Sequence, residues 1–277
     1  MTTFEKIMLI LDSRMSEPSA YGWFHILFIL LVILTTYLLC KRYSKCNFDT
    51  FKKIVLISWI VMVVLEFYKQ IDMAMDVEDG VLTGWSYSWY SFPFQFCSSP
   101  LYVLPLIAFS KSEKKAEPLI AFCATFSLFA GLAVYVVPGD VLITVIGVNI
   151  QTMVHHGLQI ILGIFFITYK NENFTFKFFL KGLPIFVVFI CCAIFLNEVG
   201  YQLLTYYEMS NKFNMFFISP HFECTMPILD ILQPKVHFIL FIIIYFIGFS
   251  LAAFIIFTGA KLILDKVTNY KLKKASA

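Results

Sequence analysis

Long apolar runs decide what this chain can fold into. The run FHILFILLVILTTYLLC, residues 24–40, contains no Asp, Glu, Lys or Arg. A helix of about 20 mainly apolar residues is long enough to cross the hydrocarbon core of a bilayer. The whole chain is 60% hydrophobic and 14% charged, with a mean hydropathy of +0.81. These values are typical of a membrane protein and exclude an ordinary soluble domain.

Further segments of the same character follow along the chain. Because a spanning segment must satisfy its own backbone hydrogen bonds, each is expected to be a helix. The sequence predicts an all-α polytopic bundle of seven transmembrane helices, over Tyr21–Cys40, Lys53–Gln70, Phe92–Ser110, Pro118–Val137, Val148–Tyr169, Phe178–Asn197 and Val236–Leu262.

The loops between these spans differ in charge. Lys and Arg follow spans one, three, five and seven, whereas the opposite loops contain mainly Asp and Glu, such as Asp76 and Glu78. Basic residues accumulate on the cytoplasmic side. We therefore expect a multi-pass protein of the cell membrane with its N-terminus outside and its C-terminus inside.

The segments outside the spans complete the predicted organisation. Residues 1–20 begin with MTTFEKIMLILD, which lacks the basic start of a signal peptide and is expected to lie at the membrane surface. Residues 21–262 form the membrane domain, and 263–277 a basic cytoplasmic tail. The external segment 198–235 is too apolar for a free loop and is expected to be partly embedded. The net charge of +3 lies in short loops, so we expect no nucleic-acid partner.

Polar residues gather near the predicted outer ends of the spans. Such residues are costly inside a membrane and are functional candidates by default. The set comprises His25, Glu66, Lys69, Cys97, His155, His156, Asn197 and His237. A structural bundle would be expected to scatter its few polar groups, so this one-sided cluster predicts a site in the outer leaflet.

Span five carries the densest part of this cluster. At 100° per residue, its polar side chains fall within one half of the helix circumference. They are Asn149, Gln151, Thr152, His155, His156 and Gln159. The following Gly157 permits close approach of another helix or of a lipid chain.

Cys97 lies in the Pro-flanked stretch SFPFQFCSSP. Pro93 suits the first turn of a helix, whereas Pro100 cannot donate to the carbonyl of Phe96 and is expected to kink or open the helix beside Cys97. A cysteine and a histidine within reach form an acyl-transfer pair, with the thiolate as nucleophile and the imidazole as base.

The remaining polar groups are assigned supporting roles in this chemistry. Glu66 or Asn197 is expected to orient the imidazole, and Lys69, Asn214 or Gln95 to stabilise the oxyanion. A site at this depth meets phospholipid esters directly, so membrane phospholipids are the expected partners.

Other interpretations of these residues remain open. Cys97 could be a packing residue or could form a disulfide with Cys224, which is also external. A metal or haem site would need His25, His156, His221 and His237, whose spacing matches no compact ligand motif. We therefore expect no metal or cofactor.

Several short motifs resemble one known family. FPFQFC is similar to the Leu-Pro-x-His-x-Cys-like opening of the third span in YwaF-like bacterial membrane proteins, a family similar to the vertebrate ether-phospholipid acyltransferase called transmembrane protein 164. Glu66, Trp85, His156-Gly157 and the segment NMFFISPHFECTMPILD, residues 214–230, extend the resemblance over most of the chain.

The resemblance implies a multi-helix membrane fold and lipid acyl transfer, with Cys97 as nucleophile and His156 as base. Two positions depart from the family pattern. Gln95 stands where the family often has His, and Met215 stands where Tyr is common.

The sequence thus favours an enzyme, a Cys–His phospholipid acyltransferase or lipid hydrolase. A transporter or ligand-binding protein using the same polar cluster is the alternative, although alternating access needs a polar route to both faces. A retinal-binding receptor is disfavoured, because only Lys235 and Lys261 flank span seven and its middle has no lysine.

Overall fold

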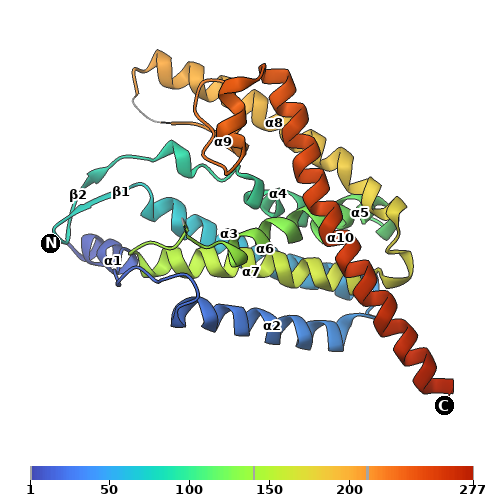
Figure 1. Ribbon diagram of the computed structural model, residues 1–277. Coiled ribbons are helices and arrows are strands. Elements are labelled where there is room, and N and C mark those ends of the chain that lie inside the picture. Colours follow the sequence, from blue (N-terminus) through green and yellow to red (C-terminus); the bar gives the residue numbers. More distant parts are fainter. Residues whose placement is uncertain (1, 140, 210–211, 277) are drawn as a thin grey trace.

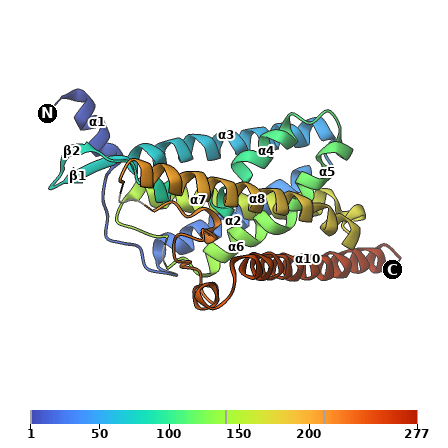
Figure 2. The ribbon, with the colours of Figure 1, turned by 90° about the horizontal axis from the view of Figure 1, so that it is seen from above.

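The computed structural model describes residues 2–139, 141–209 and 212–276 and is mostly helical. The long helices run roughly side by side (Figures 1 and 2), and six of them are long and apolar enough to cross a membrane. They are α2 (Trp23–Tyr43), α3 (Phe48–Asp72), the continuous helix Glu113–Val136, α7 (Ile146–Tyr169), α8 (Phe176–Tyr206) and α10 (Phe238–Ser276). The helix Glu113–Val136 consists of α5 (Glu113–Phe122), a π-helical stretch (Cys123–Ser127) and α6 (Leu128–Val136).

The segment expected as the third span differs from the prediction. It contains a 3₁₀ turn, Phe96–Ser98, and then the nine-residue helix α4 (Pro100–Ala108). At 1.5 Å per residue α4 is about 14 Å long, less than half the hydrocarbon core. Proline has no N–H to donate, so Pro100 stands at the first helical position. Pro93 precedes all helical turns of this segment, and its expected place in the first turn is wrong.

Helix α7 forms the centre of the bundle and packs against α2, α3 and α6. Two glycines bring α6 and α7 into close contact. A Cβ atom on Gly131 of α6 would lie 2.7 Å from the carbonyl oxygen of His156, and one on Gly157 would lie 2.8 Å from the Tyr135 hydroxyl and from Val32 of α2. The close approach expected at Gly157 is therefore made by helices on two sides.

One end of the bundle is covered by short elements (Figure 1). Helix α1 (Thr3–Leu11) starts with a capping box of Thr2 and Glu5. The strands β1 (Met75–Glu78) and β2 (Val81–Trp85) form an antiparallel hairpin, whose turn residues Asp79 and Gly80 both have positive φ. The C-terminus lies at the opposite end of the bundle.

The segment between α8 and α10 folds onto the same end. Its apolar residues Phe213, Met215, Phe216 and Ile218 are buried, and it includes the one-turn helix α9 (Leu229–Leu232). Burial of this backbone in protein removes it from contact with lipid.

Candidate functional site

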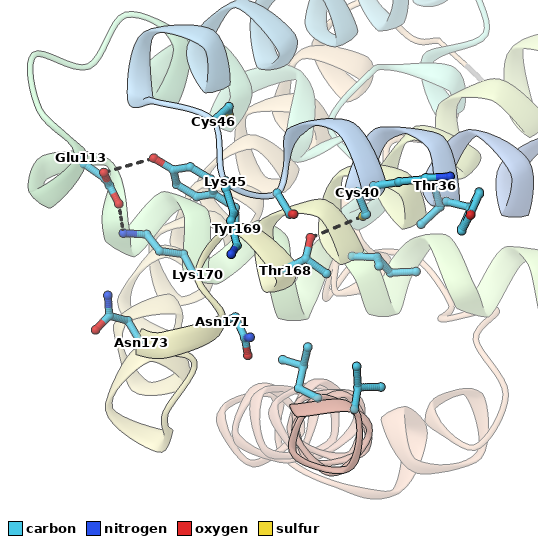
Figure 3. A pocket seen from close by; sticks show the side chains of 16 residues that line it. Thr36, Cys40, Lys45, Cys46, Glu113, Thr168, Tyr169, Lys170, Asn171 and Asn173 are labelled. Carbon is cyan, nitrogen blue, oxygen red and sulfur yellow. Dashed lines mark hydrogen bonds and ion pairs between the residues drawn. The ribbon is translucent and has the colours of Figure 1, made fainter. Parts of the chain in front are cut away.

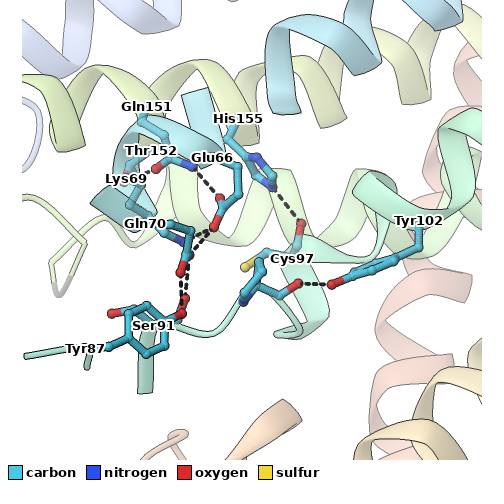
Figure 4. Close-up of polar contacts among 11 residues, drawn as sticks. Glu66, Lys69, Gln70, Tyr87, Ser91, Cys97, Tyr102, Gln151, Thr152 and His155 are labelled. Carbon is cyan, nitrogen blue, oxygen red and sulfur yellow. Dashed lines mark hydrogen bonds and ion pairs between the residues drawn. The ribbon is translucent and has the colours of Figure 1, made fainter. Parts of the chain in front are cut away.

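The polar side chains meet where three elements converge: the end of α3, the non-helical run 91–99 and the first half of α7 (Figure 4). Helix α3 supplies Glu66, Lys69 and Gln70. Helix α7 supplies Gln151, Thr152, His155, His156 and Gln159, all of them buried.

Glu66 is the centre of a closed hydrogen-bond network. Its Oε1 accepts from Lys69 Nζ at 2.7 Å and from Gln70 Nε2 at 2.6 Å, and its Oε2 accepts from Gln151 Nε2 at 3.0 Å. The Thr152 hydroxyl donates weakly to Gln151 Oε1, at 3.4 Å. Because the Glu66 side chain is 8% exposed and that of Lys69 is 19% exposed, the pair is screened little by solvent.

Gln70 joins this network to the loop before Cys97. Its Nε2 also donates to the Ser91 carbonyl at 2.8 Å, and its Oε1 accepts from the Tyr87 hydroxyl. Burial, together with the negative charge of Glu66, raises the pKa of Tyr87 to about 12. Tyr87 therefore remains a neutral donor at physiological pH.

The non-helical run 91–99, and Pro105, which cannot donate to the Leu101 carbonyl four residues earlier, leave backbone carbonyls without helical partners, and side chains satisfy several of them. The carbonyl oxygen of Cys97 accepts from His155 Nε2 at 3.0 Å and from Gln159 Nε2 at 2.9 Å. The Tyr102 hydroxyl donates to the Pro93 carbonyl at 2.7 Å, and Trp59 Nε1 donates to the Leu101 carbonyl at 2.8 Å. The polar face of α7 thus stabilises the main chain around Cys97, in addition to any catalytic role it has.

These contacts also fix the tautomers of two histidines. A carbonyl oxygen only accepts, so His155 carries its proton on Nε2, and His156, whose Nδ1 lies 2.8 Å from the Thr152 carbonyl, carries its proton on Nδ1. The other ring nitrogens, His155 Nδ1 and His156 Nε2, are buried and have no hydrogen-bond partner within the described part of the chain. Each neutral imidazole therefore has one free basic nitrogen.

The Cys97 thiol lies beside this network. All seven cysteines are free, so the alternative of a bridge between Cys97 and Cys224 is not realised. The sulfur of Cys97 points toward the side of the site where Glu66 and Lys69 lie (Figure 4). Among the described residues, the thiol makes no hydrogen bond with His155 or His156.

Three predicted supporting residues instead anchor the segment between α8 and α10. Gln95 donates to the Asn214 carbonyl at 3.0 Å and accepts from the Phe216 amide at 2.8 Å. Asn197 makes the same pair of bonds with the carbonyl and amide of Met215. Asn214 bonds the Glu223 carbonyl and the Ser219 amide. The side-chain amide groups of all three residues form hydrogen bonds with main-chain atoms. Their role in the structure is therefore to position this segment.

The remaining candidates lie elsewhere. Trp85 is 52% exposed in β2 and packs against Phe4 of α1. His25 contacts Tyr21 and Tyr135, and His221 pairs with Glu198 at 2.8 Å. Within the described ranges, no group of three or more His, Cys, Asp or Glu residues is arranged to hold a metal ion.

Several residues of the site were not proposed from the sequence as members of it, among them Gln70, Tyr87 and Tyr102. Gln70 follows Glu66 by four residues in the same helix, so the two side chains lie on one face. This spacing could have predicted their hydrogen bond from the sequence. Tyr245 of α10 is fully buried, and its hydroxyl has no hydrogen-bond partner among the described residues. A single tyrosine within the apolar run FIIIYFIGF is its only sequence signal.

Comparison with known proteins adds no relative to this description: no family model, no curated protein and no solved structure matches the chain.

Proposed function

We propose that this multi-pass membrane protein is a lipid acyltransferase or lipid hydrolase with Cys97 as its nucleophile. One observation carries the proposal. A free thiol lies inside an apolar bundle beside a Glu66–Lys69 ion pair and two neutral imidazoles, each with an unpartnered ring nitrogen. Buried unpartnered polar atoms of this kind are uncommon unless a ligand or a reaction uses them.

In the proposed reaction, His156 Nε2 takes the proton of the Cys97 thiol as the thiolate attacks a phospholipid ester carbonyl. The tetrahedral intermediate collapses to a thioester on Cys97, and the alcohol leaves with the proton from His156. A second alcohol or water then attacks the thioester and regenerates the thiol. The Thr152 carbonyl holds the His156 ring in the tautomer that this step needs.

The charged pair supplies electrostatic support. Lys69 is the cation nearest to the network and would stabilise the thiolate and the oxyanion, while Glu66 holds the ammonium in place. His155 and Gln159 fix the main chain at Cys97 and act as positioning residues. The thiol–imidazole hydrogen bond would form when substrate binds, since such bonds are often loose in the free enzyme.

The proposed topology places this site in the outer leaflet of the cell membrane, with the N-terminus outside. Seven crossings are then needed, and the third is composite: the non-helical run 92–99 followed by α4. This is consistent with burial of Phe94, Phe96, Ser98 and Ser99, because irregular backbone at membrane depth must be surrounded by protein. The resemblance of FPFQFC and His156-Gly157 to the YwaF-like family supports the same assignment.

The test is the acyl-enzyme. Purified protein incubated with a phospholipid should gain the mass of one acyl chain, which hydroxylamine removes. Cys97→Ala should abolish the adduct and lipid turnover, and His156→Gln should slow acylation by about 10²-fold or more. Cys192→Ala, which removes an exposed thiol, is the matched control.

The absence of any adduct, together with full lipid turnover by Cys97→Ala, would rule out the proposed nucleophile. Loss of solute uptake by Glu66→Gln without a change in lipid composition would instead favour transport.

A further inference from the structure

A second polar site lies at the opposite end of the bundle, between α2, α7 and α10 (Figure 3). It is an open cleft with a volume of about 1430 Å³. Thr168, which lines it, is twelve residues along α7 from His156, or about 18 Å at 1.5 Å per residue. The cleft is therefore separate from the site around Cys97.

The cleft has an apolar wall and a polar rim. Tyr37, Ile164, Leu264 and Val267 line the wall. The rim consists of Lys41, Ser44, Lys45, Lys170, Asn171 and Asn173. The volume exceeds the 300–1,000 Å³ that is usual for sites of small soluble ligands.

The charges of the rim are not balanced. Lys170 pairs with Glu113, which also accepts from the Tyr169 hydroxyl at 3.2 Å (Figure 3). Among the described residues, Lys41 and Lys45 have no carboxylate partner, and Lys41 Nζ lies 5.4 Å from the ring centre of Tyr37. Lys41 and Lys45 thus bring two positive charges to the lining of the cleft that no carboxylate of the described residues balances.

A further polar group in the cleft also has no partner. The Thr36 hydroxyl is buried and forms no hydrogen bond with any residue that the structure describes. A buried hydroxyl without a partner is destabilising unless a ligand or water supplies one. This observation is independent of the lysine charges and also points to an occupant of the cleft.

We propose that this cleft binds the headgroup of an anionic phospholipid. The phosphate would lie between Lys41 and Lys45, and the amides of Asn171 and Asn173 would contact the headgroup. A lipid fits better than a soluble anion because the lining itself includes exposed apolar side chains on both flanking helices, Tyr37 of α2 and Val267 of α10. Basic pockets between membrane helices are a known mode of headgroup recognition.

The test is a titration of phosphatidylglycerol into phosphatidylcholine nanodiscs, with retained lipid counted by native mass spectrometry. The parent chain should retain phosphatidylglycerol in preference to phosphatidylcholine. Lys41→Gln and Lys45→Gln should each weaken retention about fivefold, and the double variant roughly 25-fold. Melting temperatures in phosphatidylcholine alone should stay close to that of the parent, because neither lysine has a carboxylate partner among the described residues and the contact of Lys41 with Tyr37 contributes only about 0.5–1 kcal/mol.

The matched control is Lys114→Gln with Lys177→Gln. It removes the same charge at the same end of the bundle from exposed positions that do not line the cleft, and should leave retention unchanged. Equal loss in both double variants would overturn the proposal, as would equal retention of the two lipids. Full displacement of the lipid by inorganic phosphate would assign the cleft to a soluble anion instead. None of these measurements depends on acyl transfer by Cys97.

Discussion

At the residue scale, polar side chains in this bundle bind main-chain atoms more often than they bind one another. Gln95, His155 and Gln159 all contact backbone of the broken third segment or of the external segment. In a membrane each unsatisfied backbone group costs several kcal/mol, so such contacts make the irregular chain tolerable. A polar residue in a membrane span can therefore indicate a break in a neighbouring helix as well as a catalytic or binding site.

Gln95 allows a direct test of this positioning role. Gln95→Leu leaves the Phe216 amide and the Asn214 carbonyl without their partner, which should destabilise the protein by about 1–3 kcal/mol. Hydrogen exchange should show faster exchange of the Phe216 amide. The control Gln202→Leu removes an exposed glutamine that bonds only Glu198, and should leave Phe216 protected. Unchanged exchange in Gln95→Leu would show that other contacts hold the segment.

The Glu66–Lys69 pair predicts a non-additive result. Glu66→Gln strands a mostly buried ammonium and should destabilise the protein by about 3 kcal/mol. The double variant Glu66→Gln with Lys69→Met removes both charges and should recover part of that loss. Thermal unfolding of the four members of the cycle measures the coupling. Simple addition of the two single effects would show that the charges do not interact.

At the scale of elements, the sequence predicted the long helices well and the third segment poorly. Hydrophobic length alone identified α2, α3, α7, α8 and α10, because a run of about 20 apolar residues is a strong signal. Residues 92–110 are equally apolar, but the chain is extended at Gln95 and α-helical only from Pro100. Pro100 breaks the helix, and the side chains of His155 and Gln159 from α7 stabilise the break by satisfying the Cys97 carbonyl.

The candidate site was predictable to a similar degree. Periodicity placed Gln151, His155 and His156 on one buried face of α7, as the structure has them. It could not show that His155 contacts the Cys97 carbonyl rather than the thiol, or that Gln95 and Asn197 bind the external segment. Those contacts depend on how separate segments pair in space: His155 and Cys97 are 58 residues apart, and Gln95 and Phe216 are 121 residues apart.

The contact between α6 and α7 predicts a contrast between two helical glycines. Gly131→Ala places a Cβ atom 2.7 Å from the His156 carbonyl oxygen, so the helices must separate, at about 1–3 kcal/mol. Gly248→Ala in α10 meets no atom within 4 Å and should be neutral or stabilising, by up to about 1 kcal/mol. Melting temperatures of both variants check this. Equal stability of the two would contradict the close approach.

At the scale of the whole molecule, the two ends of the bundle differ in chemistry. The end that carries α1, the hairpin and the external segment holds the Glu66 network and the free imidazole nitrogens. The opposite end holds the cleft with Lys41 and Lys45. A protein with a buried neutral site at one face and a basic cleft at the other has a preferred orientation, because anionic lipids and the translocation machinery both favour basic residues on the cytoplasmic side.

This asymmetry predicts the sidedness of labelling by a membrane-impermeant maleimide in intact cells. Glu78→Cys lies in the exposed hairpin and Lys114→Cys lies in the exposed first turn of α5, at the basic end of the bundle. Labelling above that of the parent chain, whose cysteines include the exposed Cys191 and Cys192, should appear for Glu78→Cys without permeabilisation. Lys114→Cys should be labelled only after the cells are opened. The reverse pattern, with only Lys114→Cys labelled in intact cells, would place the Cys97 site in the inner leaflet. Labelling of both positions in intact cells would mean that residues 79–113 do not cross the membrane. The expected pattern requires the short helix α4 and the run before it to complete one crossing together.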